Sequence, residues 1–246
     1  MKAEKVAFRD LGTIDYKKAW DIQEYFFSKA VAAKLKNRAS PEVLREQASH
    51  ILFFCEHPHV YTLGKSGSEK HLLINEQTLS SRGATFYRIN RGGDITYHGP
   101  GQLVGYPIFD LDYFFTDIHK YMRLLEEVII RTLDEYLIKA GRIKGLTGVW
   151  LDPDSPRARK ICAFGIRCSR WVTMHGFSFN VNTDLSYFRD IIPCGIADKS
   201  VTSLSKELGT TVDIGEVKSK LKKYFSEIFE IEIVEDKEES AVIRGL

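Results

Sequence analysis

Apolar side chains recur at helical spacing in two long stretches of the chain. The first runs from Asp15 to about Asn37, and the second from Asp117 to Ala140. Asp117 suits an N-cap and Gly141 a C′ residue, so a helix is predicted over the whole second stretch. Its expected buried stripe consists of Ile118, Tyr121, Met122, Leu125, Val128, Ile129, Leu133, Tyr136 and Leu137. Shorter helices are expected over 75–83 and near 214–229.

Strand patterns separate these helices. The run HILFFCEH (50–57) is continuously apolar, which is typical of a strand buried on both faces, and ATFYRIN (84–90) alternates. Further strands are expected at 5–9, 102–111, 148–151, 160–168, 172–181 and 230–234. The stretch YTLGKSG (61–67) is expected to be a strand end that runs into a glycine turn. The runs 160–168 and 172–181 form a hairpin that turns near Ser169–Trp171. Irregular alternation of strands and helices predicts an α+β fold, a mixed β-sheet packed with helices. We expect one domain over 1–234 and a polar tail over 235–246.

The bulk composition is that of an ordinary soluble protein. The 246 residues are 43% hydrophobic and 28% charged. The net charge of +2 is too small to indicate nucleic acid or a membrane as a partner. The start MKAEKVAFRD has no apolar signal core, and no run approaches a membrane span, so we expect a reducing cytoplasm. The acid-free basic stretch Ser155–Arg170 is either a solvated strand face or a docking patch for an acidic partner.

The cysteines and histidines give no metal-binding pattern. Four cysteines over this length do not form a disulfide scaffold, and there is no CxxC. Cys162 and Cys168 lack a second pair at zinc spacing, so no structural metal is expected. His57 and His59 have no matching carboxylates nearby and are interpreted as loop histidines.

Cys194 and Lys160 are the candidate catalytic pair. Cys194 lies between Pro193 and Gly195, a constrained setting that suits a nucleophile, although a lone cysteine is more often structural. Lys160 opens the apolar run ICAFGI and could project into a cleft, although an exposed lysine at a strand start is the commoner case. An ammonium beside a thiol favours the thiolate, the nucleophile that carries an acyl group.

Cys162 is a second thiol that could meet Lys160. Residues two apart in a strand share a face, so Cys162 as well as Cys194 could lie near the ammonium. The residues alone do not decide between the two cysteines.

The loop RGGDITYHGPGQ holds four glycines: Gly92, Gly93, Gly99 and Gly101. It lies between two predicted strands and lacks the G-x-x-x-x-G-K pattern, which argues against a P-loop or a Rossmann motif. The glycines favour close backbone approach to an elongated ligand. Arg91 and His98 could meet a carbonyl or phosphate, or His98 could be a satisfied histidine in a glycine-rich hairpin.

Several motifs together resemble one family. RGGDITYHGPGQLVGYPIFDL, RKICAFGIR, HGFSFNVNTDL and FRDIIPCGI, with EHPHVYTLGKSG and VTSL, are similar to the lipoyl(octanoyl) transferases over roughly residues 50–210. The resemblance implies the fold of biotin and lipoate protein ligases. It also implies transfer of an octanoyl group from acyl carrier protein to the ε-amine of a lysine on a lipoyl domain. Such domains occur in 2-oxoacid dehydrogenases and the glycine-cleavage carrier protein.

The resemblance also implies the site residues. Cys194 matches the family's acyl-thioester cysteine, and Lys160 matches the lysine that lowers its pKa. The implied substrate-binding residues are Arg91, Gly92, Gly93, Asp94, Ile95, Thr96, Tyr97, His98, Ala163, Phe164, Gly165, Gly176, Phe177 and Ser178. No metal, nucleotide or tightly bound organic cofactor is implied. The chain departs from the family pattern at Cys162, where a small apolar residue is usual, and at Asp94, where a neutral polar residue is frequent.

Two other functions fit parts of the pattern. An ATP-dependent lipoate or biotin ligase shares the implied fold and a lysine in the cleft, but it works through an acyl-adenylate and does not need Cys194. A binding module that docks lipoyl domains or acyl carriers without turnover would have no use for a lysine matched to a cysteine.

Overall fold

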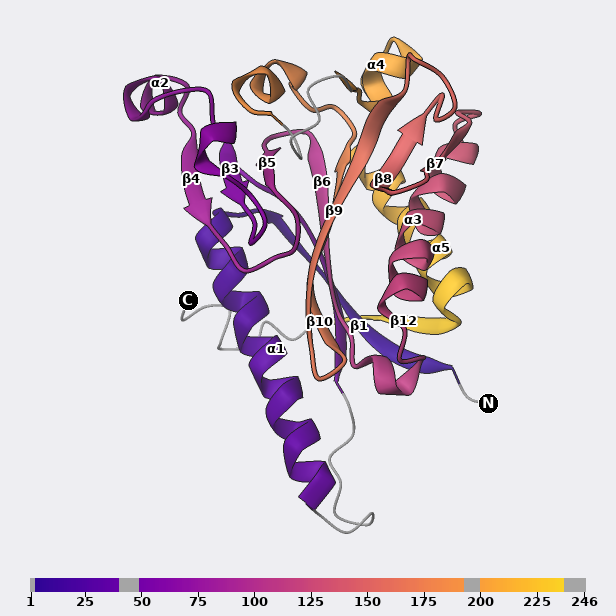
Figure 1. The fold of residues 1–246 in the computed structure, drawn as a ribbon. Helices are drawn as coiled ribbons and strands as arrows, with labels where there is room; N and C mark the ends of the chain where they lie inside the picture. The colour runs from indigo at the N-terminus through magenta and orange to yellow at the C-terminus, as the bar shows by residue number, and fades with distance from the viewer. Residues whose placement is uncertain (1–2, 40–48, 193–199, 237–246) are drawn as a thin grey trace.

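A computed structural model describes residues 3–39, 49–192 and 200–236 of the chain. Over these residues a nine-stranded mixed sheet has the strand order β12-β1-β2-β6-β10-β9-β8-β7, with β11 paired to β9, and a small sheet has the order β4-β3-β5 (Figure 1). The strands are β1 (Glu4–Thr13), β2 (His50–Glu56), β3 (Val60–Leu63), β4 (Thr85–Arg88), β5 (Ile95–His98), β6 (Gln102–Ile108), β7 (Ala140–Ile143), β8 (Leu146–Leu151), β9 (Arg159–Ser169), β10 (Val172–Asn180), β11 (Ser200–Val201) and β12 (Ile231–Glu235). The α-helices are α1 (Tyr16–Ala39), α2 (Glu76–Ser81), α3 (Ile118–Asp134), α4 (Leu204–Leu208) and α5 (Ile214–Phe229). Short 3₁₀ turns are η2 (Glu69–His71), η3 (Leu111–Tyr113) and η4 (Leu185–Asp190).

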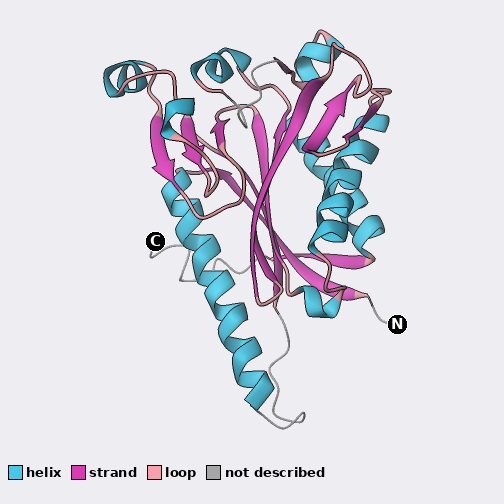
Figure 2. Ribbon diagram, in the orientation of Figure 1, coloured by secondary structure: helices cyan, strands magenta, loops and turns pink. Residues whose placement is uncertain are grey.

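Helices cover both faces of the large sheet (Figure 2). Alternate residues of β2 show the arrangement: Leu52 and Phe54 belong to the apolar cluster under α3 and α5, whereas Ile51 and Phe53 belong to the cluster under α1. A strand covered on both sides has no polar face, which is why 50–57 is continuously apolar. The predicted mixed sheet packed with helices is confirmed. None of the helices in the described ranges is long and apolar enough to cross a membrane.

Helix α1 is anchored at both ends. At its start, the Asp15 carboxylate accepts a hydrogen bond from the Lys18 backbone N–H (3.2 Å). Near its end, the buried Lys34 ammonium lies 2.5 Å from Asp110 and 2.7 Å from Asp112. The polar second half of the helix is therefore tied to the end of β6 by charge, while its first half packs through apolar residues.

Helix α3 confirms one predicted end and corrects the other. The Asp117 side chain caps the helix by accepting from the His119 and Lys120 backbone N–H groups. The helix stops at Asp134, so the expected continuation to Ala140 is wrong. Leu137 has φ 57 and is 94% exposed, so it turns the chain instead of extending the buried stripe. Gly141, expected as the C′ residue, lies in β7.

The predicted hairpin between β9 and β10 is confirmed. Arg170 and Trp171 form its turn with φ values of 51 and 65, the left-handed conformation that suits a tight two-residue connection. The pattern missed four short elements: α4, β5, β7 and β11. The division into a domain over 1–234 and a tail stays a prediction, because residues 237–246 lie outside the described ranges.

Candidate active site

One cavity of about 530 Å³ collects residues from both sheets and from α3. Its lining includes Lys160, Arg91, Gly92, Gly93, Asp94, Ile95, Thr96, His98, Ala163, Phe164, Gly165, Gly176, Phe177 and Ser178. The structure thus gathers three sequence-distant motifs around one space. That these residues bind substrate stays a prediction.

Among the predicted site residues that the structure describes, Tyr97 is not in this lining. Tyr97 faces the opposite side of β5 from its neighbours Thr96 and His98 and belongs to the apolar cluster of the small sheet. Its ring stacks on Tyr187, and its hydroxyl lies 2.8 Å from His59 Nδ1. Cys194 lies outside the described residues. The described chain ends at Ile192 before it and resumes at Ser200.

Both flanks of the 193–199 segment reach the cavity. Phe188 and Val201 line it. Val201 also pairs with Lys160 where β11 joins β9. On the other side, Ile191 forms a bridge to Leu72 beside the small sheet. The segment that carries Cys194 is therefore flanked by residues at the cavity, and one of these is the direct strand partner of Lys160.

The glycine-rich loop holds Arg91 in the cavity wall. Arg91 is 7% exposed, and its Nη2 donates to the Thr62 carbonyl (2.7 Å) and hydroxyl (3.0 Å). Gly165 makes room for it, since a Cβ there would come within 2.8 Å of Arg91 Cδ. The loop is not irregular throughout, as the sequence suggested, because Ile95–His98 forms β5 and pairs with β3. The pairing of β5 with β3 closes the loop that carries Arg91, and the Arg91 side chain lies in the cavity wall.

Two histidines of the cavity lining, His98 and His175, are buried. Burial lowers the pKa of His98 well below its ordinary value, and His57 and Arg91 add smaller effects in the same direction. Its ring nitrogens meet Gln102 Oε1 (2.8 Å) and Thr62 Oγ1 (3.3 Å). Burial followed by the Arg91 charge lowers the pKa of His175 to about 3. His98 is therefore a satisfied histidine in the wall, one of the alternatives left open by the sequence.

His57 and His59 lie in the loop between β2 and β3, as the sequence predicts, and both rings have defined contacts there. His57 is fully buried, and its nitrogens meet the Ile14 carbonyl (2.8 Å) and the Tyr106 hydroxyl (2.7 Å). His59 stacks on Tyr187 with ring centroids 4.2 Å apart. Over the described part of the chain, no group of three His, Cys, Asp or Glu side chains could hold a metal ion.

Asp94 has a local partner. Its carboxylate lies 2.5 Å from His71 Nδ1 and accepts from the Ile95 backbone N–H (2.7 Å). It ties the glycine-rich loop to η2.

Lys160 lies in the wall of the cavity between β8 and β11. Its ammonium is 4.7 Å from the centroid of the buried Trp150 ring. Trp150 is also its strand partner across the β8–β9 ladder. The sequence predicted the strand that carries Trp150 but gave it no role. The sequence signal for Trp150 was its place as an aromatic residue in the strand before the one that carries Lys160.

Cys162 does not share the cavity with Lys160. The β8–β9 ladder pairs Val149 with Cys162 but Trp150 with Lys160, so β9 carries one extra residue between the two. This bulge breaks the alternation that would have put both side chains on one face. Cys162 is fully buried in the apolar cluster under α3, and burial raises the pKa of its thiol well above the ordinary value, despite an opposing effect of Lys160.

The basic stretch Ser155–Arg170 is partly neutralised by acids from elsewhere in the fold. Arg159 contacts Glu207 at 2.5 Å and Asp152 at 2.5 Å. Arg167 contacts Glu24 at 2.7 Å. These two arginines tie elements together, which reduces the charge that a docking patch could present.

Comparison with known proteins identifies the family. The family model of the lipoyl protein ligase A/B catalytic domain matches residues 15–226. An octanoyltransferase of Flavobacterium johnsoniae is 61% identical over 94% of this chain and 99% of the relative. An octanoyltransferase of Cytophaga hutchinsonii is 59% identical over 94% of this chain and 95% of the relative. The chain belongs to the octanoyltransferases. The expected family resemblance is confirmed, and the alternative of a binding module without turnover is wrong because octanoyltransferases are acyltransferase enzymes of protein lipoylation.

Solved structures agree with this octanoyltransferase fold. A bipartite lipoate protein ligase described with its E2 lipoyl domain, from Thermoplasma acidophilum, matches with a TM-score of 0.69 at 19% identity, covering 100% of this chain and 92% of that one. A lipoate-protein ligase A bound with ATP matches with a TM-score of 0.68 at 18% identity, covering 100% of this chain and 94% of that one. The predicted lipoate ligase-like fold is therefore confirmed.

Proposed function

We propose that this octanoyltransferase moves an octanoyl group from acyl carrier protein to a lysine of a lipoyl domain through a thioester on Cys194. The observation that carries the proposal is the setting of Lys160. It lies in the wall of the cavity and pairs with Val201, where the chain returns from the segment that contains Cys194.

In the first half-reaction, the Cys194 thiol gives its proton to the Lys160 amine, and the thiolate attacks the carrier's thioester carbonyl. A new carbon–sulfur bond forms to Cys194 and the bond to the carrier sulfur breaks. The departing carrier thiolate takes the proton back from the Lys160 ammonium. Backbone N–H groups of the glycine-rich segments stabilise the oxyanion. Gly92 N–H is not among them, because it donates to the Ile166 carbonyl (2.9 Å).

In the second half-reaction, the amine of the acceptor lysine attacks the Cys194 thioester. Lys160 takes the proton that this amine loses, an amide forms, and Cys194 leaves as the thiolate. The Cys194 thiolate and Lys160 ammonium that formed before the first attack are restored. A thioester is already activated, so the cycle needs neither ATP nor a metal ion.

The cavity suits the acyl chain of the donor. Apolar side chains such as Val104, Ile166 and Phe177 supply part of its wall. At about 0.8 kcal/mol per buried methylene, an octanoyl chain with roughly six methylenes gains about 5 kcal/mol. That free energy is enough to hold the chain while the thioester reacts, and a longer chain is disfavoured once it meets the end of the cavity.

The proposed acceptors are lipoyl domains of 2-oxoacid dehydrogenases and of the glycine-cleavage carrier protein. Two observations support this class. The curated relatives are octanoyltransferases, and a structure of the same fold is described with an E2 lipoyl domain. Transfer from the donor to such a domain must proceed without ATP if the thioester route is correct.

Intact-protein mass spectrometry tests the thioester. Wild type and Cys194→Ala are mixed with octanoyl-acyl carrier protein in the absence of ATP. The proposal predicts one octanoyl adduct on wild type and none on Cys194→Ala. An adduct on both proteins would place the acyl group elsewhere and contradict the proposal. No adduct on wild type, together with octanoylation that starts only when free octanoate and ATP are added, would favour an acyl-adenylate ligase instead.

A further inference from the structure

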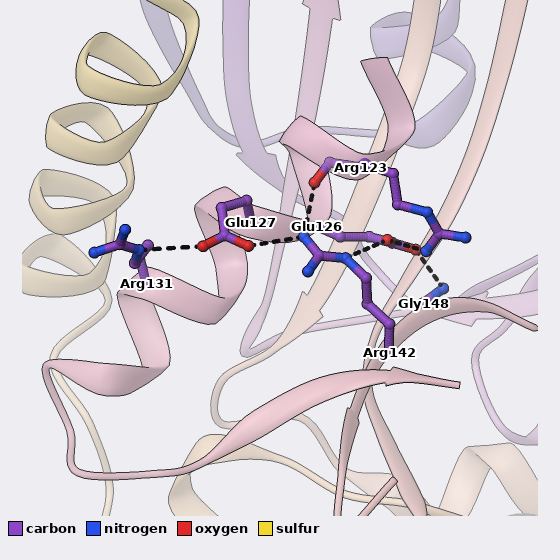
Figure 3. Close-up of polar contacts among 6 residues, drawn as sticks. All are labelled: Arg123, Glu126, Glu127, Arg131, Arg142 and Gly148. Atoms are coloured by element: carbon purple, nitrogen blue, oxygen red, sulfur yellow. Dashed lines mark hydrogen bonds and ion pairs between the residues drawn. The ribbon is translucent and has the colours of Figure 1, made fainter. Parts of the chain in front are cut away.

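A carboxylate is buried beside the lysine strand without a part in the reaction. Glu126 of α3 is 1% exposed. Its Oε2 accepts from Arg123 (2.6 Å) and from Arg142 Nε (2.9 Å). Its other oxygen, Oε1, accepts from the Gly148 backbone N–H (3.2 Å; Figure 3).

Two arginines balance the charge of this carboxylate without occupying Oε1. Arg142 also contacts Glu127 (2.8 Å), which holds Arg131 (3.1 Å) further along the same helix. A buried carboxylate is stable when its charge is paired and its oxygens are hydrogen-bonded. Oε1 of Glu126 therefore accepts the hydrogen bond from the Gly148 N–H in β8, while Oε2 accepts from the two arginines.

Gly148 and Trp150 are two residues of β8 that lie beside Lys160. Gly148 has φ 137, in the region that favours glycine. A Cβ at this position would lie 3.1 Å from Lys160 Cε and 3.2 Å from Trp150 Nε1. The lysine stem and the indole, with the Cys162 carbonyl (3.1 Å), therefore crowd the place that a side chain at 148 would take.

Trp150 completes the contact surface. Its ring is buried and lies 4.7 Å from the Lys160 ammonium, within the range of a cation–π interaction. Gly148 lies beside the stem of the lysine, Trp150 faces its charged end, and Glu126 holds the backbone N–H of Gly148. A shift of β8 at Gly148 would move both contacts together.

We propose that Glu126 is a positioning residue for Lys160, acting through its hydrogen bond to Gly148 and the Gly148–Trp150 surface. The inference rests on the proposed function, because it takes Lys160 as the proton-transfer group. Lys160 must reach a sulfur and a nitrogen in turn, and a misplacement of about 1 Å can slow a reaction about 100-fold.

The test measures the rate of acyl-enzyme formation by rapid quenching and intact mass across a range of octanoyl-carrier concentrations. Glu126→Ala is compared with Glu127→Ala, which removes the neighbouring carboxylate that does not touch Gly148. Gly148→Ala is compared with Gly209→Ala, another glycine at positive φ (71), where an added Cβ meets nothing within 4 Å. Circular dichroism establishes that each variant is folded.

Glu126→Ala and Gly148→Ala are expected to lower the saturating rate about 10-fold to 100-fold. The half-saturating donor concentration should stay within about twofold, because the cavity that binds the acyl chain is unchanged. Both control variants should stay within about twofold of wild type in rate.

Glu126→Gln is a milder variant that serves where Glu126→Ala does not fold. Its single acceptor oxygen cannot serve both Gly148 and the two arginines, so its rate should lie between those of Glu126→Ala and wild type. A Gly148→Ala rate equal to that of Gly209→Ala would overturn the proposal, since the backbone of Gly148 would then have no part in placing Lys160. A Glu126→Ala rate equal to that of Glu127→Ala would overturn it as well.

Lys160→Ala separates this inference from the proposed function. If Lys160→Ala forms the acyl-enzyme at the wild-type rate, the proposed role of the lysine fails. If Lys160→Ala is slow while Glu126→Ala matches wild type, only the positioning role of Glu126 fails.

Discussion

Buried histidines beside the cavity make the stability of this protein depend on pH. Burial lowers the pKa of His57 from 6.5 to about 4, the favourable hydrogen bond to Ile14 notwithstanding. The folded form therefore resists protonation that the unfolded chain accepts. The stability contributed by neutral His57 is present above pH 6.5 and is lost as the pH falls toward about 4.

His57→Gln should reduce this pH dependence. One such group contributes up to about 1.4 kcal/mol per pH unit within that window. Urea denaturation of wild type and His57→Gln between pH 6.5 and 4.5 measures the slopes. The variant should lose less stability per pH unit than wild type, whatever its stability at neutral pH. Equal slopes would mean that His57 is protonated in the folded protein.

Cys162 is expected to be dispensable for the reaction. Its thiol is fully buried in the apolar cluster, and burial raises its pKa, so little thiolate is available. Cys162→Ala should form the octanoyl-enzyme at a rate within about twofold of wild type and lose roughly 1 kcal/mol of stability from the small cavity. Intact mass and urea denaturation measure the two effects. If folded Cys162→Ala forms no adduct, Cys162 carries the acyl group and the proposed thioester on Cys194 is wrong.

At the scale of elements, the sequence predicts those whose pattern is set by burial. Helix α5 has a clear apolar stripe because one face is buried, and strand β2 is continuously apolar because it is covered on both faces. The end of α3 was missed because Tyr136 and Leu137 continue the apolar spacing, while the chain turns at a non-glycine residue with positive φ. Strand β5 was missed because it is short and lies among glycines, and its pairing with β3 is a tertiary contact. The β9 bulge likewise depends on its partner strand, so it cannot be deduced from alternation.

Helix α1 is expected to depend on its buried ion pair. Lys34→Ala leaves Asp110 buried without its ammonium, and breaking one side of such a pair costs about 3 kcal/mol. Lys17→Ala removes an exposed i,i+4 pair with Asp21 on the same helix and should change stability by less than about 0.5 kcal/mol. Urea denaturation compares the two variants. Equal effects would show that Lys34 does not hold the helix to the sheet.

At the scale of the whole molecule, the fold brings three distant stretches to one cavity. Two adjacent antiparallel strands, β9 and β10, carry Lys160, Gly165 and Gly176, and the loop between β4 and β5 places Arg91 beside Gly165. The motifs identified the family and about half of this lining, because they include the residues on these strands and in this loop. They did not identify Trp150, Glu126 or Gly148, whose proposed roles depend on contacts between β8, β9 and α3.

The measurement that tests the central claim most directly follows the acyl group from one protein to the other. Wild-type enzyme is first acylated by octanoyl-acyl carrier protein, and the carrier protein is then removed. The octanoyl-enzyme is mixed with an unmodified lipoyl domain in the absence of ATP. Intact mass spectra should show the mass of one octanoyl group leaving the enzyme and appearing on the domain, with peptide mapping placing it on Cys194 before transfer and on the domain's lysine afterwards. An octanoyl-enzyme that keeps its acyl group in the presence of the domain, while the complete mixture turns over, would contradict the account.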